Sequence, residues 1–183
     1  MLSILQYAKE LLHPALPEDG YAADFTMGNG HDTAFLSRTV GESGRVYAFD
    51  IQAQAVASTA KNLKEWGCPD NYTLINASHH LVKDYVKEPI KAGMFNLGYL
   101  PGGDKRITTM RETTMPAIEA AVDLLDHGGV LLVAVYPGHA EGDAEGKMVL
   151  DYFSTRDRHA ICCTLIRILN SPTSPFFIVV EKK

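Results

Sequence analysis

Apolar and polar positions along the chain follow two periods. Stretches with apolar residues every three or four positions indicate amphipathic helices, and short apolar runs bounded by Gly, Pro, Asn or Asp indicate strands. Short strands that alternate with helices favour a parallel sheet that is covered by helices on both faces. The pattern predicts helices near residues 3–13, 31–40, 52–66, 108–126 and 143–156, and strands at 21–25, 45–49, 72–75, 92–96, 130–136, 162–169 and 176–181.

The end of the chain departs from this alternation. The apolar runs 162–169 and 176–181 are joined only by residues 170–175, which are too few for a crossover helix. These two strands must therefore be antiparallel. We expect a Rossmann-like α/β fold, with a seven-stranded, mostly parallel sheet, a C-terminal antiparallel hairpin and helices on both faces.

The length and composition predict one soluble domain over residues 1–183. The chain has 183 residues, of which 46% are hydrophobic and 21% charged, which is typical of a globular protein. The formal net charge of −5 creates no overall attraction for nucleic acid, so any RNA contact requires a local basic surface.

The cysteines and the N-terminal segment predict a cytoplasmic location. Cys68, Cys162 and Cys163 cannot all pair within one chain, and their spacing fits neither a zinc site nor a redox motif. The first residues resemble an amphipathic helix and not a signal peptide or membrane span. This helix and the last strands could form the face of a homodimer.

A glycine-rich turn after the first strand predicts a nucleoside cofactor. Asp24 closes the strand and Gly28-Asn29-Gly30 opens the next helix, so that backbone N–H groups can approach a ligand. Thr33 stands where a dinucleotide fingerprint needs its third glycine, which disfavours a pyrophosphate. A carboxylate close to the turn suits the cationic amino group of S-adenosylmethionine. The alternative is a tight turn without any ligand.

Two further strand ends complete the predicted cofactor site. Asp50 follows the second strand and can accept hydrogen bonds from both ribose hydroxyls, beside Gln52. The alternative is that Asp50 caps the following helix. Ser78 and His79 follow the third strand, where an adenine would lie, although turn chemistry alone also favours Asn and Ser there.

The loop after the fourth predicted strand carries the second functional signal. Glycines and a proline give residues 94–106 little intrinsic order, yet the loop contains Asn, Tyr, Asp, Lys and Arg. Asn96-Leu97-Gly98-Tyr99 resembles the motif of amine-directed methyltransferases, in which a carbonyl oxygen orients the amine and an aromatic ring packs beside it. The alternative is an ordinary surface loop with turns at Pro101-Gly102.

Charged residues near the other strand ends suggest a rim for RNA phosphates. His139 follows the fifth strand and could hold a phosphate or, with Glu145, orient the acceptor, whereas a lone loop histidine is more often structural or solvated. The basic candidates form two groups, and the alternative for each is a solvated surface. The first group is Lys105, Arg106 and Arg111, and the second is Arg156, Arg158, His159 and Arg167.

Three motifs together resemble one family over nearly the whole chain. They are residues 24–33, the segment Asn96-Leu97-Gly98-Tyr99-Leu100-Pro101-Gly102-Gly103-Asp104-Lys105, and Tyr136-x-Gly138-His139. They look like the small bacterial proteins long labelled rRNA methylases and now understood as tRNA methyltransferases. These convert 5-aminomethyl-2-thiouridine at the wobble position to 5-methylaminomethyl-2-thiouridine.

The resemblance implies a class I methyltransferase fold, S-adenosylmethionine as the methyl donor and a tRNA anticodon stem-loop as the partner. It implies catalytic roles for Asn96 and Tyr99. The expected cofactor-binding residues are Asp24, Thr26, Gly28, Asn29, Gly30, Asp50, Gln52, Ser78, His79 and Asn96. The expected substrate-binding residues are Leu100, Gly102, Asp104, Lys105, Arg106, His139 and Glu145.

Two other functions stay open at the level of the sequence. One keeps the donor and changes the acceptor to ribosomal RNA or a small-molecule amine. The other is a nucleotide-binding Rossmann protein without methyl transfer, such as a nicotinamide oxidoreductase. The absent third glycine and the C-terminal hairpin oppose the second function.

Overall fold

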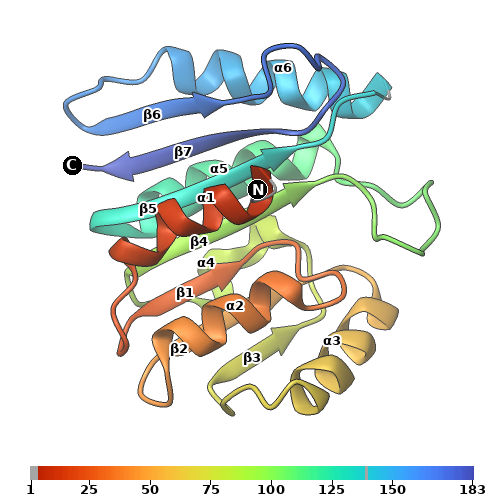
Figure 1. Cartoon of the computed structure of the whole chain (residues 1–183), viewed down its shortest axis with the longest axis vertical. Coiled ribbons are helices and arrows are strands. Elements are labelled where there is room, and N and C mark those ends of the chain that lie inside the picture. Colours follow the sequence, from red (N-terminus) through yellow and green to blue (C-terminus); the bar gives the residue numbers. More distant parts are fainter. Residues whose placement is uncertain (1–3, 139) are drawn as a thin grey trace.

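The computed structural model describes residues 4–138 and 140–183, which form a single seven-stranded sheet (Figure 1). The strand order is β3-β2-β1-β4-β5-β7-β6. The first five strands are parallel, and β7 is antiparallel to both β5 and β6. The strands are β1 (Tyr21–Asp24), β2 (Arg45–Phe49), β3 (Tyr72–Ile75), β4 (Ile90–Leu97), β5 (Leu125–Val135), β6 (Ile161–Ile166) and β7 (Phe176–Lys182).

Helices cover both faces of the sheet, and each face has its own buried cluster. Apolar residues of α1 and α2 pack on one face, and those of α4, α5 and α6 pack on the other. No helix among residues 4–138 and 140–183 has the length and hydropathy needed to cross a bilayer. The helices are α1 (Ile4–Leu12), α2 (His31–Val40), α3 (Ala53–Glu65), α4 (Val82–Tyr85), α5 (Arg111–Leu124) and α6 (Ala140–Ser154), with short 3-10 turns η1 (His13–Ala15) and η2 (His79–Leu81).

The predicted fold class and all seven strands are confirmed, including the antiparallel hairpin. The largest boundary difference concerns β5, which begins at Leu125 instead of residue 130 because Leu125 already pairs with Ile90 across an irregularity in the ladder. The sequence analysis missed the helical turns between 79 and 85. Their signal is the spacing of the buried residues His79, Val82 and Val86.

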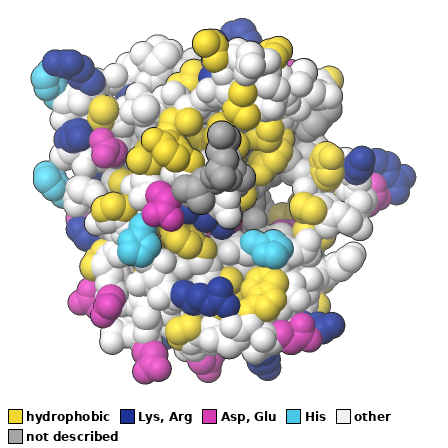
Figure 2. Space-filling model, viewed as in Figure 1, with side chains coloured by type: hydrophobic (Ala, Val, Ile, Leu, Met, Phe, Trp, Pro, Cys, Tyr) yellow, Lys and Arg dark blue, Asp and Glu magenta, His cyan; other side chains and the backbone are white. Residues whose placement is uncertain are grey.

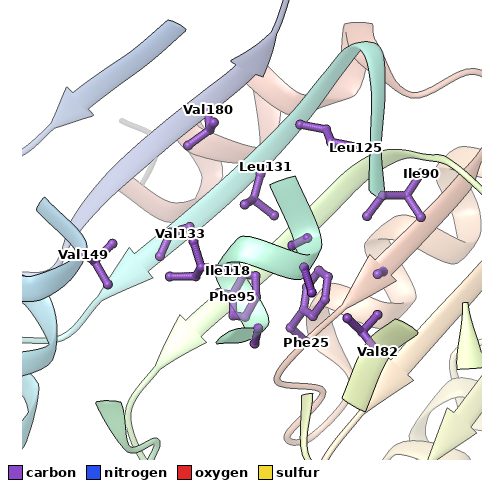
Figure 3. Close-up of a cluster of buried hydrophobic side chains, with 14 of the residues drawn as sticks. Phe25, Val82, Ile90, Phe95, Ile118, Leu125, Leu131, Val133, Val149 and Val180 are labelled. Atoms are coloured by element: carbon purple, nitrogen blue, oxygen red, sulfur yellow. The ribbon is translucent and has the colours of Figure 1, made fainter. Parts of the chain in front are cut away.

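Stacked aromatic rings form the centre of the larger buried cluster (Figure 3). The rings of Phe25 and Phe95 lie 4.1 Å apart and nearly parallel, and Phe49 stacks on Phe25 at 6.2 Å. Phe25 immediately follows β1, while Phe49 and Phe95 belong to β2 and β4. This packing fixes the relative positions of the three neighbouring strand ends that carry the motifs.

The carboxyl ends of the parallel strands meet at one edge of the sheet, from which residues 98–110 project as an arm (Figure 1). A bridge between Tyr99 and Thr108 closes the base of this arm. In the same view, the space-filling surface is hollowed between the arm and the body of the protein, and basic side chains lie on the arm (Figure 2). Ligands of open α/β sheets bind at this edge.

Candidate active site

Two adjoining cavities open at the carboxyl edge of the sheet. The larger cavity has a volume of about 870 Å³ and the smaller one about 310 Å³. Each volume is of the size that small molecules occupy in proteins. The residues that line both cavities are Thr26, Gly28, Asn96, Gly98, Tyr99 and Pro101. Predicted cofactor residues and predicted acceptor residues therefore meet at one junction.

The glycine-rich turn forms one wall of this junction. Gly28 and Gly30 have φ angles of +51° and +87°, which L side chains rarely adopt. Asn29 ties the turn to its neighbours, because its Nδ2 donates to the Pro101 carbonyl (3.2 Å) and its Oδ1 accepts from Ser58 Oγ (3.1 Å). Gly30 lies outside both linings and occupies the N-cap position of α2. Its expected role in ligand contact becomes one of shaping the turn.

Asp50 faces the smaller cavity with its carboxylate already oriented. One oxygen accepts from the Gly28 N–H (3.1 Å) and the other from the Gln52 N–H (2.9 Å). Each oxygen keeps a second lone pair, as ribose hydroxyls require. Gln52, not Asp50, is the N-cap of α3, so the alternative role of Asp50 as that cap is wrong. Burial raises the pKa of Asp50, and its bonds to backbone N–H groups oppose this shift.

We expect Asp50→Ala to weaken S-adenosylmethionine binding by about 2 kcal/mol, because charge-assisted hydrogen bonds are lost. Calorimetric titration of both proteins measures the change. The Asp70→Ala variant, which removes an exposed aspartate after α3, is the control and should bind like the wild type. Unchanged affinity in Asp50→Ala would reject the ribose-binding role.

His79 and Ser78 also line the smaller cavity, where an adenine was expected. His79 is 7% exposed, and its Nδ1 lies 3.1 Å from the Phe25 carbonyl, so Nδ1 carries the proton and donates. Its buried Nε2 has no hydrogen-bond partner. Burial lowers the pKa of His79 to about 4, which makes the ring a neutral acceptor near pH 7.

Asp24 does not reach either cavity, which corrects its expected contact with the methionine amino group. Its carboxylate is fully buried and accepts from Thr33 Oγ1 (2.6 Å) and from the Thr26 N–H (3.1 Å). Burial, and then the charge of Asp32, raise the pKa of Asp24 to about 7. Asp24 therefore supports the turn from behind.

The raised pKa of Asp24 predicts a pH-dependent stability. A carboxyl group whose folded-state pKa lies above its unfolded value near 4 stabilises the fold at low pH, and this contribution is lost as the pH rises through about 7. We expect the uncharged Asp24→Asn variant to gain about 2 kcal/mol relative to the wild type between pH 5 and pH 8. Urea unfolding at both values measures this gain. A constant difference between the two proteins would contradict it.

A polar network fixes the side chain of Asn96. Its Nδ2 donates to Asp32 Oδ2 (2.5 Å), and its Oδ1 accepts from the Tyr136 hydroxyl (3.3 Å). Because a carboxylate can only accept, Asp32 determines which end of the amide faces it. On the other side, Lys9 Nζ lies 2.5 Å from Asp32 Oδ1. The sequence analysis missed Lys9, Asp32 and Tyr136 as parts of the site.

Tyr99, at the base of the arm, lines both cavities together with Asn96. Tyr99 is 41% exposed and has Lys105 Nζ 5.4 Å from its ring centre. Lys105 lines the larger cavity and Leu100 the smaller one. Asp104 and Arg106 form an exposed ion pair (2.6 Å), and neither these two nor Gly102 lines a cavity. Their roles in binding stay predictions.

Glu145 is a structural residue, which corrects its expected contact with the acceptor. It is 1% exposed and accepts from Thr109 Oγ1 (2.8 Å) and Thr114 Oγ1 (2.5 Å). These bonds fasten the base of the arm and the first turns of α5 to α6. The other candidate from that loop, His139, lies outside the described residues.

The comparisons with known proteins identify the family. Residues 46–182 match the family described as "Putative rRNA methylase". The chain belongs to this family. A crystal structure of a "putative rRNA-methylase" from Clostridium thermocellum shares 38% identity and a TM-score of 0.96, with 100% of this chain and 99% of that chain covered. A "putative methyltransferase" from Streptococcus mutans in complex with SAH shares 36% identity and a TM-score of 0.90, with 100% of this chain and 99% of that chain covered.

A curated relative carries a more specific name. The Arabidopsis thaliana "tRNA (mnm(5)s(2)U34)-methyltransferase, chloroplastic" is 36% identical over 173 residues, which are 87% of this chain and 62% of the relative. This chain thus spans less than two thirds of that relative's length. The predicted family and class I methyltransferase fold are confirmed. The predicted cofactor, S-adenosylmethionine, is also confirmed as the cofactor of this family.

The residues of the site fit this cofactor. The basic rim around the cavities, however, contains fewer residues than the sequence predicted. Gly28 lines both cavities with a φ of +51°, a conformation that favours glycine, and an added Cβ would make only ordinary contact with Leu100 Cδ1 at 3.5 Å. Beside it, the Asp50 carboxylate keeps lone pairs for the ribose hydroxyls of the cofactor. In the rim, Arg111 is paired with Glu141 at 3.0 Å. Residues 156–159 precede β6, whose first residue Ile161 pairs with Lys182, at the edge opposite the cavities. Arg167 alone of that second group follows a strand end on the cavity side.

Proposed function

We propose that this chain transfers a methyl group from S-adenosylmethionine to the aminomethyl group of 5-aminomethyl-2-thiouridine at the tRNA wobble position, giving 5-methylaminomethyl-2-thiouridine. The observation that carries the proposal is the fixed orientation of Asn96 at the junction of the two cavities. Its Oδ1 accepts from Tyr136 and retains one lone pair, which suits an N–H donor and not a carbonyl or phosphate oxygen.

The smaller cavity would hold the adenosine part of the cofactor. Asp50 and Gln52 would bind the ribose, and Ser78 and His79 would contact the adenine. The turn at Gly28 would place the methionine part toward Asn96. When bound, the cofactor would supply its methyl group: the nitrogen lone pair of the amine forms the new N–C bond, and the electron pair of the broken S–C bond stays on sulfur.

The larger cavity would receive the modified uridine. Asn96 Oδ1 would accept an N–H of the amine and aim its lone pair, while the partly exposed ring of Tyr99 would pack against the base. Lys105 at the mouth would contact the RNA backbone. The name of the Arabidopsis relative supports this acceptor, and partnership with the anticodon stem-loop is part of the proposal.

The test is methyl transfer from labelled S-adenosylmethionine to tRNA carrying 5-aminomethyl-2-thiouridine, followed by nucleoside mass spectrometry. We expect a gain of one methylene unit that is confined to this nucleoside. tRNA lacking the aminomethyl group is the control and should remain unmodified. Transfer to ribosomal RNA or to small amines in place of this tRNA would keep the methyltransferase assignment and reject the wobble-uridine acceptor.

A further inference from the structure

A buried ion pair lies directly behind Asn96. Lys9 of α1 and Asp32 of α2 are in contact at 2.5 Å, and their side chains are only 17% and 7% exposed. Lys9 also lies over the ring of Phe35, with Nζ 5.2 Å from its centre. Little solvent reaches this pair, so salt and water screen its charges only weakly. Whatever net charge it carries is therefore felt inside the larger cavity, which Asp32 lines.

The pair also belongs to a wider group of titratable side chains. The physical causes that shift the pKa of the Asp24 carboxyl include the charges of both Asp32, which raises it, and Lys9, which lowers it. Charge on Asp32 raises the pKa of Tyr136 too, after burial. Among the described residues, the titratable groups in this network or on the lining of the larger cavity are Lys9, Asp24, His31, Asp32, Tyr99, Lys105 and Tyr136.

The protonation state of the acceptor makes this charge balance important. An aliphatic amine is mostly an ammonium ion near neutral pH, and only the free amine has a lone pair with which to attack. An unpaired carboxylate within a few ångströms favours the charged form of a neighbouring cation, typically by 1–3 pKa units. Asp32 without Lys9 would hold the acceptor as an unreactive ammonium ion.

We propose that Lys9 is a positioning residue for the reaction: its pairing with Asp32 keeps the larger cavity close to neutral, so that the bound ammonium releases its proton to solvent and attacks as the free amine. The same pairing leaves Asp32 Oδ2 available to Asn96 Nδ2. The inference rests on the proposed function, because it needs an amine as acceptor. It assigns a role in the reaction to a residue of α1, which lies outside the three sequence motifs.

The experiment is the single-turnover rate of methyl transfer as a function of pH, with saturating tRNA carrying 5-aminomethyl-2-thiouridine. This rate reports the ionisation of the bound complex without product release. In Lys9→Met we expect the midpoint of the rising limb to move up by about one pH unit or more. In Asp32→Asn, which removes the carboxylate in contact with Lys9, we expect it to move down, by less than the shift in Lys9→Met because Asp24 ionises more readily without Asp32 and balances part of the charge. The double variant should return close to the wild-type midpoint.

Two controls separate charge from structure. Lys9→Arg keeps the cation and should keep the wild-type midpoint, and Lys61→Met removes a lysine from the exposed Lys61–Glu65 pair and should do the same. S-adenosylmethionine affinity and the unfolding temperature of each variant establish that the fold is retained. If Lys9→Met does not fold, two results still test the inference. The midpoint of the rising limb should move down in Asp32→Asn and should stay at the wild-type value in Lys9→Arg.

Different failures have different meanings. A wild-type enzyme that binds S-adenosylmethionine but methylates no aminomethyl tRNA at any pH overturns the proposed function and this inference together. An active wild type whose pH profile is unchanged in Lys9→Met or in Asp32→Asn overturns the inference alone.

Discussion

Replacing Asn96 with alanine is expected to lower the rate constant of methyl transfer by about 100-fold, while S-adenosylmethionine affinity changes by less than about threefold. Losses of this size follow when a preorganised polar group at the reacting centre is removed. Asn96 Oδ1 is held by the amide's bond to Asp32, so the alanine variant loses both the acceptor atom and its orientation. Single-turnover kinetics and calorimetry measure the two quantities separately.

The controls for this variant address position and chemistry. Asn170→Ala removes an exposed asparagine from the loop between β6 and β7 and should leave the rate unchanged. If Asn96→Ala kept a nearly normal rate, the amine-orienting role would be wrong even though the cavity is formed as described. If cofactor affinity fell as much as the rate, Asn96 would act mainly in cofactor binding.

The parts of the site that the sequence predicts are those that lie in short motifs at the ends of predicted strands. Gly28 and Gly30 share one turn, and Asp50 follows the neighbouring strand, so spacing alone brings these residues together. Asn96 and Tyr99 were likewise found because a strand end and a short motif place both on one loop. Local sequence rules are sufficient for such features.

The network around Asn96 could not be predicted in this way. Four separate parts of the chain contribute to it: α1 with Lys9, α2 with Asp32, β4 with Asn96, and the residue after β5, Tyr136. The pairing of β4 with β5 and the packing of α1 and α2 on the sheet bring them into contact. An aspartate in the first turn of a helix is also a common helix-dipole partner, so Asp32 gave no distinct signal.

The burial of Glu145 could have been predicted from the sequence, whereas the burial of Asp24 could not. Glu145 occupies the buried face of α6 together with Gly142, Gly146, Val149 and Phe153, and this helical period was visible in the sequence. Asp24 offered no such signal, because its burial depends on the packing of α2 on the sheet, from which Thr33 donates to it. A carboxylate at a strand end therefore predicts a ligand contact only when its neighbours leave it accessible.

The second large effect is a loss of stability when the glycine-rich turn at residues 28–30 is changed. We expect Gly30→Ala to destabilise the fold by about 3 kcal/mol. Gly30 has a φ of +87°, which costs an L residue roughly 1–2 kcal/mol, and its added Cβ would lie 2.9 Å from Thr59 Cγ2 and 3.3 Å from the Thr59 backbone. Overpacking of this kind adds roughly 1–3 kcal/mol. Urea unfolding measures the loss.

Gly128 provides the matched control for this prediction, because its φ of +73° imposes a similar backbone cost while nothing lies within 4 Å of an added Cβ. Gly128→Ala should therefore lose only about 1–2 kcal/mol. Thr59→Ser removes the crowding methyl group and keeps the hydroxyl that donates to the Gly28 carbonyl (3.0 Å), so it should recover part of the loss in a Gly30→Ala background. Equal losses in Gly30→Ala and Gly128→Ala would show that contact with α3 does not determine the geometry of this turn. A larger loss of stability in Gly30→Ala, relieved by Thr59→Ser, would instead show that α3 determines the geometry of the turn. It would do so through the close approach of Thr59 to the Gly30 backbone.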